Sequence, residues 1–297
     1  MRVTQGMISN NMLRNLTNSY GKMDTYLHQL STGKKINRPS DDPVIAMKGM
    51  GYRTELVRVE QYIRNTNEVH NWMDNTDAAL DKATSAMQRI RELAVQASNG
   101  TYDKEELVNI SEEVKQLKEH MIEIANTNVN DKYIFNGTKT DTAPINQETG
   151  AVDFDNSPVL IEVSSGTALK ANVDGNEVFG GEPSIFDAID TFIEKLEATG
   201  DSDLDNEAID ASIAELDIGI NNIVNARAEL GARMNRLELV ENRLSEQEVI
   251  ATQTMSQNED IDYAKAITEL ITQESLHRAA LSAGARIIQP SLVDFLR

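Results

Sequence analysis

The 297-residue sequence contains no cysteine and only six prolines, and aromatic residues make up just 5% of it. The absence of cysteine excludes disulfides, thiolate metal sites and cysteine nucleophiles. The scarcity of aromatics leaves little material for a broad globular core, so we expect the apolar residues in narrow stripes. A formal net charge of −20 argues against a nucleic-acid partner, because phosphate binding needs a basic surface. No apolar run approaches the roughly 18 residues that a membrane-spanning helix needs, so no membrane partner is expected either.

Patterns typical of enzymes and metal sites are also missing. The sequence has no phosphate loop, nucleophile elbow or dinucleotide fingerprint. Residues 201–206 resemble the start of a calcium loop, but Asn206 and Ser212 stand where the loop needs its glycine and its bidentate glutamate. The histidines are scattered without metal-ligand spacing: His28, His70, His120 and His277. We predict no enzymatic activity and no catalytic, cofactor-binding or metal-binding residues.

Apolar residues instead recur at alternating spacings of three and four, which is typical of helices that pack as coiled coils. Gly33 is expected to end the first helix, and Asp42 to cap the second, with Pro43 in its first position. A short turn should fold the third helix back on the second. A polar stretch at 250–260 predicts a break between the last two helical units. The expected helices are 12–33, 43–98, 103–125, 207–248 and 260–290.

The segment 136–206 differs from its flanks, with fifteen acidic residues, three lysines and three of the six prolines. Turn signals separate short β-prone runs at 133–135, 159–163 and 177–179, and one short helix is expected at 185–196. The fold class that we predict is mainly α. It is a long antiparallel helical coiled-coil bundle built from the N- and C-terminal segments, with an inserted small, mostly-β domain.

We predict three domains: a terminal coiled-coil core domain from 1–42 and 251–297, a helical shaft domain from 43–137 and 207–250, and an acidic, mostly-β outer domain at 138–206.

The terminal helices cannot bury their stripes alone, because isolated helices of this length are marginal in water. Residues 1–40 carry six basic residues and one acid, which suits pairing with the acidic C-terminal segment. Two paired helices still leave apolar surface in water, so we predict that other subunits of an assembly cover it. The predicted assembly interface comprises Ile8, Met12, Leu16, Met23, Leu27, Leu30, Ile267, Leu270, Ile271, Leu281, Ile288, Leu292, Val293, Phe295 and Leu296.

Two segments of the helical flanks carry a recognisable motif. Residues 30–37, Leu-Ser-Thr-Gly-Lys-Lys-Ile-Asn, resemble the motif that joins the terminal and shaft domains in the flagellin and hook-associated protein family. Residues 87–101 resemble its most recognisable segment. The resemblance covers roughly 1–138 and 207–297. The residues that carry the family motifs are Arg38, Pro39, Asp41, Asp42, Pro43, Arg89, Arg91, Glu92 and Leu93.

Three segments, 38–43, 132–138 and 291–296, are similar to the branch of the family found at the hook–filament junction. The resemblance implies a structural subunit of the bacterial flagellum that self-assembles into a ring or tube. Its implied partners are hook-associated protein 1 below, flagellin above and a cytoplasmic export chaperone. The resemblance also implies an extracellular location, reached by type III export without a cleaved signal peptide. Residues 1–6 contain no apolar signal core, which fits that implied route.

Two alternatives stay open: a filament subunit, flagellin itself, and a secreted coiled-coil protein or adaptor that does not polymerise. In flagellins the surface that matches Arg89, Arg91, Glu92 and Leu93 is read by an innate-immune receptor. Ordinary packing within the shaft is the reading that we favour for these residues here.

Overall fold

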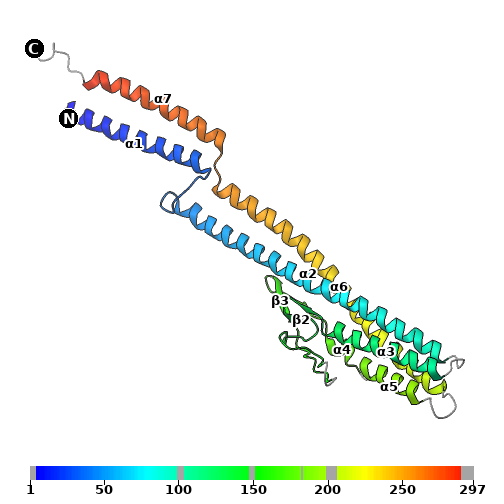
Figure 1. Cartoon of the computed structure of the whole chain (residues 1–297). Coiled ribbons are helices and arrows are strands. Elements are labelled where there is room, and N and C mark those ends of the chain that lie inside the picture. Colours follow the sequence, from blue (N-terminus) through cyan, green and yellow to red (C-terminus); the bar gives the residue numbers. More distant parts are fainter. Residues whose placement is uncertain (1–4, 99–103, 147–150, 182, 199–205, 289–297) are drawn as a thin grey trace, which may run out of the picture. The chain divides into compact units, whose positions relative to one another are not determined.

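The computed structural model describes residues 5–98, 104–146, 151–181, 183–198 and 206–288 (Figure 1). The chain forms two compact units. We call the described residues of 1–58 and 247–297 the terminal unit, and those of 59–246 the central unit. The three-domain division drawn from the sequence remains a prediction.

Five long helices confirm the predicted fold class. They are α1 (Gln5–Thr32), α2 (Pro43–Ser98), α3 (Lys104–Ala125), α6 (Asn206–Glu259) and α7 (Tyr263–Ile288). The α6 helix continues through most of the expected break at 250–260 and ends at Glu259, so the interruption lies at residues 260–262.

Local signals explain where these helices begin and end. The Asp42 carboxylate accepts the backbone N–H groups of Val44 and Ile45, at 2.9 and 3.1 Å, and so caps α2 as predicted. Gly33 follows the last residue of α1 with φ +72°, a conformation that glycine adopts without strain. The cap expected for α3 at Asp103 lies outside the described residues.

The core of the central unit is formed by the apolar stripes of its helices. Met73 and Leu80 of α2, Val114 of α3 and Leu230 of α6 are completely buried. The guanidinium of Arg227 on α6 donates to Asp77 and Asp81 of α2, with its Nε 2.8 Å from Asp77 Oδ1 and its Nη1 2.6 Å from Asp81 Oδ1. This arginine therefore ties two core helices together at the edge of their seam.

The helix predicted at 185–196 is confirmed as α5 (Ile185–Ala198), which packs against α3. Its apolar face is buried, with Ile189 and Phe192 inaccessible to solvent. The segment 138–206 therefore contributes a helix to the core of the central unit.

Two antiparallel hairpins form the strand region. β1 (Asn128–Val129) pairs with β2 (Lys132–Tyr133), and β3 (Leu160–Ser164) pairs with β4 (Thr167–Lys170). The predicted run 159–163 thus corresponds to β3, and only the first residue of 133–135 is in a strand.

The strand predicted at 177–179 is wrong, because these residues belong to the short helix α4 (Gly175–Phe179). The Asp174 side chain caps this helix by accepting the backbone N–H of Asn176 at 2.9 Å. Phe179 lies in an aromatic cluster, with its ring centroid 5.3 Å from that of Phe135 and 6.0 Å from that of Phe154. Packing and a cap outweigh the β propensity of two residues here.

Asparagine side chains hold the irregular chain around these hairpins. Asn126 both donates to the carbonyl of Ile145 and accepts its N–H, at 2.9 and 3.0 Å. Asn136, which is buried, donates to the carbonyl of Thr142 and accepts the N–H of Asp155. These amides satisfy backbone groups that no strand partner reaches.

We expect Leu230→Ala to lower the free energy of unfolding by roughly 2–5 kcal/mol, because it opens a cavity in the core. Leu239→Ala is the matched control on the same helix: Leu239 is 72% exposed, so its loss should change stability by no more than about 0.5 kcal/mol. Urea unfolding followed by circular dichroism measures both. Equal losses would contradict the core described above.

Asp155 makes stability depend on pH. Hydrogen bonds from the hydroxyls of Thr138 and Ser157, at 2.6 and 2.8 Å, lower the pKa of its carboxyl. The stabilisation is therefore complete above the pKa of the unfolded carboxyl, about 3.9, and disappears as the pH falls toward the folded value. Asp155→Asn should reduce the loss of stability between pH 5 and pH 3, measured as the shift of the urea midpoint. An unchanged pH profile would contradict this role.

Candidate assembly surface

The α1 and α7 helices pack against each other as an antiparallel pair (Figure 1). Four contacts set their register: Met12 over Gly284, Ser19 to Gln273, Tyr20 to His277, and Gly33 to Tyr263. Gly284 is buried, and a side chain there would collide with the end of Met12. The predicted pairing of the two terminal segments is therefore present within one chain.

The predicted interface residues whose side chains the structure describes divide into two groups. One group is half-buried: Met12, Leu16, Met23, Leu30 and Leu270. The other is exposed in this single chain: Ile8, Leu27, Ile267, Ile271 and Leu281. Ile288 ends α7, but its side chain is outside what the structure describes, as are Leu292, Val293, Phe295 and Leu296.

Sequence reasoning missed part of the exposed apolar surface. On the same two helices five further large apolar side chains are more than half exposed: Met7, Leu13, Tyr20, Tyr263 and Leu276. The adjoining parts of α2 and α6 add Val44, Met47, Met50, Val57, Val249 and Ile250. The sequence did contain a signal for this surface. The large apolar residues outside the heptad positions are too numerous for a single neighbouring helix to cover. We call the exposed apolar side chains of α1 and α7 the outer face.

Charges are sparse on both helices. α1 has three charged residues in 28, and α7 has five in 26, while charged residues make up 26% of the whole chain. An exposed helix normally carries more charge than this, because charged side chains hold its outer surface in water. Low charge and exposed apolar side chains together are typical of a surface that another subunit covers.

Several polar side chains lie between α1 and α7. Gln273 Nε2 donates to Ser19 Oγ at 2.9 Å. A hydrogen bond with Glu269 raises the pKa of the Tyr26 phenol, and the partial burial of Tyr26 and the negative charge of Glu269 raise it further. His277 is 6% exposed, and neither of its ring nitrogens has a hydrogen-bond partner within the described residues. Its ring instead packs edge-on against Tyr20, with 4.2 Å between centroids.

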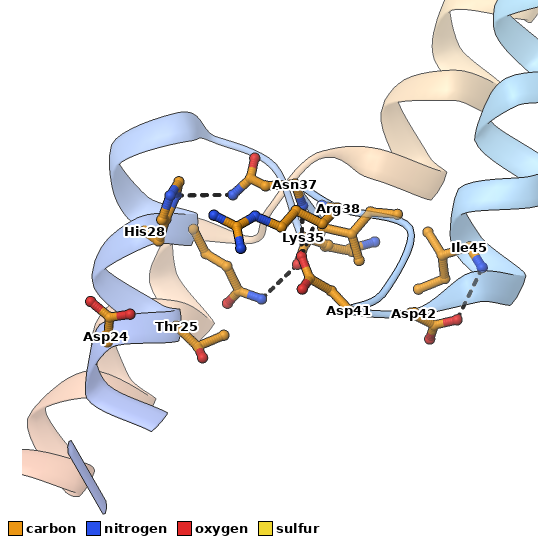
Figure 2. Close-up of a pocket in the computed structure, with 11 residues that line it drawn as sticks. Asp24, Thr25, His28, Lys35, Asn37, Arg38, Asp41, Asp42 and Ile45 are labelled. Atoms are coloured by element: carbon orange, nitrogen blue, oxygen red, sulfur yellow. Dashed lines mark hydrogen bonds between the residues drawn. The ribbon is translucent and has the colours of Figure 1, made fainter. Parts of the chain in front are cut away.

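The family motif at 38–43 forms the tight link between α1 and α2 (Figure 2). The Asp41 carboxylate accepts the backbone N–H groups of Arg38 and Asn37, at 2.9 and 3.1 Å, which lowers its pKa. Pro39 lies in the exposed turn, and Asp42 and Pro43 begin α2. An open cavity of about 570 Å³ lies beside the turn, lined in part by His28, Lys35 and Arg38. These motif residues shape the link between helices.

The second motif lies in the central unit and joins three helices. Arg89 Nε is 2.8 Å from Glu113 Oε1 of α3, and its Nη1 is 3.2 Å from Glu92. Arg91 pairs with Asp217 of α6 at 2.5 Å, and Leu93 is buried. These contacts support the reading that the segment serves packing between helices.

Other kinds of site find no support in the part of the chain that the structure covers. No three His, Cys, Asp or Glu side chains among the described residues are grouped so that they could hold a metal ion. The calcium-loop-like residues 201–205 lie outside the described ranges. No helix in the described ranges combines the length and the hydropathy needed to cross a bilayer.

Comparison with known proteins shows the family. The profile of the bacterial flagellin N-terminal helical region matches residues 3–140, and that of the bacterial flagellin C-terminal helical region matches residues 213–296. The chain therefore belongs to the flagellin family, as the sequence resemblance predicted, and it is a structural, non-enzymatic component of the flagellum.

Individual relatives agree. Flagellar hook-associated protein 3 of Escherichia coli K12 is 28% identical over 303 residues, covering 95% of this chain and 96% of that protein. Flagellin of Bacillus subtilis is 30% identical over 309 residues, and the alignment covers 100% of this chain and 100% of that protein. The solved structure of flagellar hook-associated protein-3 from Legionella pneumophila superposes with a TM-score of 0.64 at 16% identity, covering 70% of this chain and 98% of that one.

Replacing His277 tests whether the buried imidazole costs stability. We expect His277→Leu to stabilise the α1–α7 pair by roughly 1–3 kcal/mol, because it removes buried polar atoms that have no partner and keeps the volume similar. Hydrogen exchange of the α7 backbone amides would slow accordingly. Faster exchange would show that the ring contributes a stabilising interaction, contrary to the description above.

Proposed function

We propose that the chain is a hook–filament junction subunit, the counterpart of hook-associated protein 3 (FlgL type). The match to hook-associated protein 3 of Escherichia coli extends over almost the full length of both chains and supports this choice. The motif residues at 38–43 and the ending at 291–296 favour the same branch. The subunit would join hook-associated protein 1 below to the flagellin filament above.

The outer face carries this proposal, because it is the surface that a single chain leaves uncovered. Ile271 is 58% exposed and Leu281 is 47% exposed, although both continue the apolar pattern of α7. Copies of the chain that pack side by side in a ring or tube would bury such residues. The terminal unit would then form the inner wall of the assembly through α1 and α7.

Export and location follow from the same proposal. The subunit would leave the cell by type III export without cleavage of a signal peptide, and it would work outside the cell in the flagellum. A cytoplasmic chaperone would hold the apolar C-terminal segment until export. This step protects the outer face from premature contact between copies.

A filament subunit is the second candidate. The match to flagellin of Bacillus subtilis, at 30% identity over both full lengths, favours it specifically. The two candidates differ in what the purified chain does alone. A filament subunit elongates into long filaments at high concentration, whereas a junction subunit stays soluble and adds only to hook ends that carry hook-associated protein 1.

The double variant Ile271→Asp/Leu281→Asp tests the outer face. We expect its monomer to keep the helical content of the wild type, because both side chains are already exposed. Attachment to hook ends should fall by at least about tenfold, since two charges would have to be buried in each contact. Electron microscopy and quantitative pull-down with hook preparations measure the attachment.

The control is Thr272→Asp/Ser282→Asp, which places the same charges one residue further round α7 at exposed polar positions. This variant should attach at a rate close to that of the wild type. Normal attachment of the apolar-to-aspartate variant would exclude the outer face as the assembly surface.

A further inference from the structure

A buried carboxylate lies where the terminal helices connect to the rest of the terminal unit. Glu259 is the last residue of α6, and its side chain is only 5% exposed. Its carboxylate lies against Gly49 of α2, where any added Cβ would collide with Glu259 Oε1. Burying a charge in this way is costly unless partners compensate it.

Two cations from different segments provide that compensation. Arg53 of α2 places its Nη2 2.6 Å from Glu259 Oε2, and Lys34, which follows α1, places its Nζ 3.7 Å from the same oxygen. The hydrogen bond with Glu259 raises the pKa of Arg53. One carboxylate thus contacts α2 and the end of the α1 segment simultaneously.

The backbone is fixed at the same place. The N–H of Lys35 donates to the carbonyl of Glu259 at 2.6 Å, and the N–H of Ile261 donates to the carbonyl of Gly33 at 2.9 Å. Lys34 also pairs with Asp260 at 2.5 Å. The chain therefore passes twice through this region, once at 33–42 between α1 and α2 and once at 260–262 between α6 and α7, and the two passages are bonded to each other.

We propose that Glu259 is a positioning residue that locks these two passages together. We call this group, Glu259 with Lys34, Arg53 and Gly49, the joint. The joint holds the α1–α7 pair in one arrangement relative to the adjoining ends of α2 and α6. This part of the inference rests on the function proposed above. The joint holds the outer face preorganised for contact with a growing assembly, so that attachment requires little further ordering of the chain.

An apolar side chain in place of Glu259 would fill the same space but could not select this arrangement. Arg53 and Lys34 compensate the carboxylate in this arrangement, whereas an arrangement that buried it away from these cations would leave the charge unpaired. Gly49 serves the same purpose, because it leaves the gap in α2 that admits the carboxylate. These two features together distinguish the joint from an ordinary surface ion pair.

Hydrogen exchange of the full-length monomer, followed by mass spectrometry, tests the joint. In Glu259→Gln, peptides that report the amides of Lys35 and Ile261 should exchange at least about tenfold faster than in the wild type. The matched control is Glu248→Gln on the same helix, because the Glu248 side chain makes no ion pair with another described residue. This control should exchange like the wild type. Rates within about twofold of the wild type in Glu259→Gln would overturn the proposal.

Arg53→Gln provides a second variant that should fold normally, because the Arg53 side chain is 62% exposed. It should accelerate exchange at the same two amides. The double variant should add little to either single change, because both remove the same interaction. Independent, additive effects would contradict a shared lock.

An attachment assay separates this inference from the proposed function. Glu259→Gln should attach to hook ends several-fold more slowly than the wild type. Ile271→Asp/Leu281→Asp should lose attachment by at least about tenfold while keeping normal exchange at Lys35 and Ile261. Faster exchange in Glu259→Gln with normal attachment would refute the role of the joint in assembly, whatever the outer face does.

Discussion

An amphipathic helix is stable in water only when something covers its apolar stripe, and this constraint organises the terminal unit. The α1 and α7 helices meet along one side of each, which half-buries residues such as Met12, Leu16 and Leu270. A second set, including Leu27 and Ile271, lies on the remaining surface. In the central unit the helices are numerous enough to cover one another, so Leu80 and Leu230 are completely buried. The difference in burial therefore reflects how many neighbours each helix has within one chain.

The helices were predictable because their signals are local and periodic. Gly33, Asp42 and Pro43 mark boundaries by their own conformational preferences, and the three-four spacing identifies the seams over many turns. The pairing of the terminal segments followed from their charges and from the need to bury a stripe. The same pattern does not distinguish the apolar residues of α1 that face α7 from those that face outward. The apolar stripe is broad, and its two edges have the same kind of residues.

Two kinds of feature could not be predicted from the sequence. One is a contact between residues that are distant in the chain, and the other is a short segment whose packing outweighs its secondary-structure propensity. Arg53 and Glu259 lie 206 positions apart, and nothing near either residue indicates the other. The polar stretch at 250–260 indicated only a break between two helical units. It is in fact a region of specific bonds, such as that from Asn258 to the carbonyl of Ile45. At 177–179, a cap and an aromatic cluster produced a helix where propensity favoured a strand.

The low charge of α1 and α7 also bears on the conditions under which subunits hold together. Contacts made mostly by apolar side chains weaken on cooling and strengthen in solutions of salts that are excluded from protein surfaces. Simple electrolytes that only screen charges should change these contacts little, because few ionic groups take part in them. An assembly joined through these helices would consequently be firmest in warm solutions of sulfate or phosphate salts and would loosen near freezing.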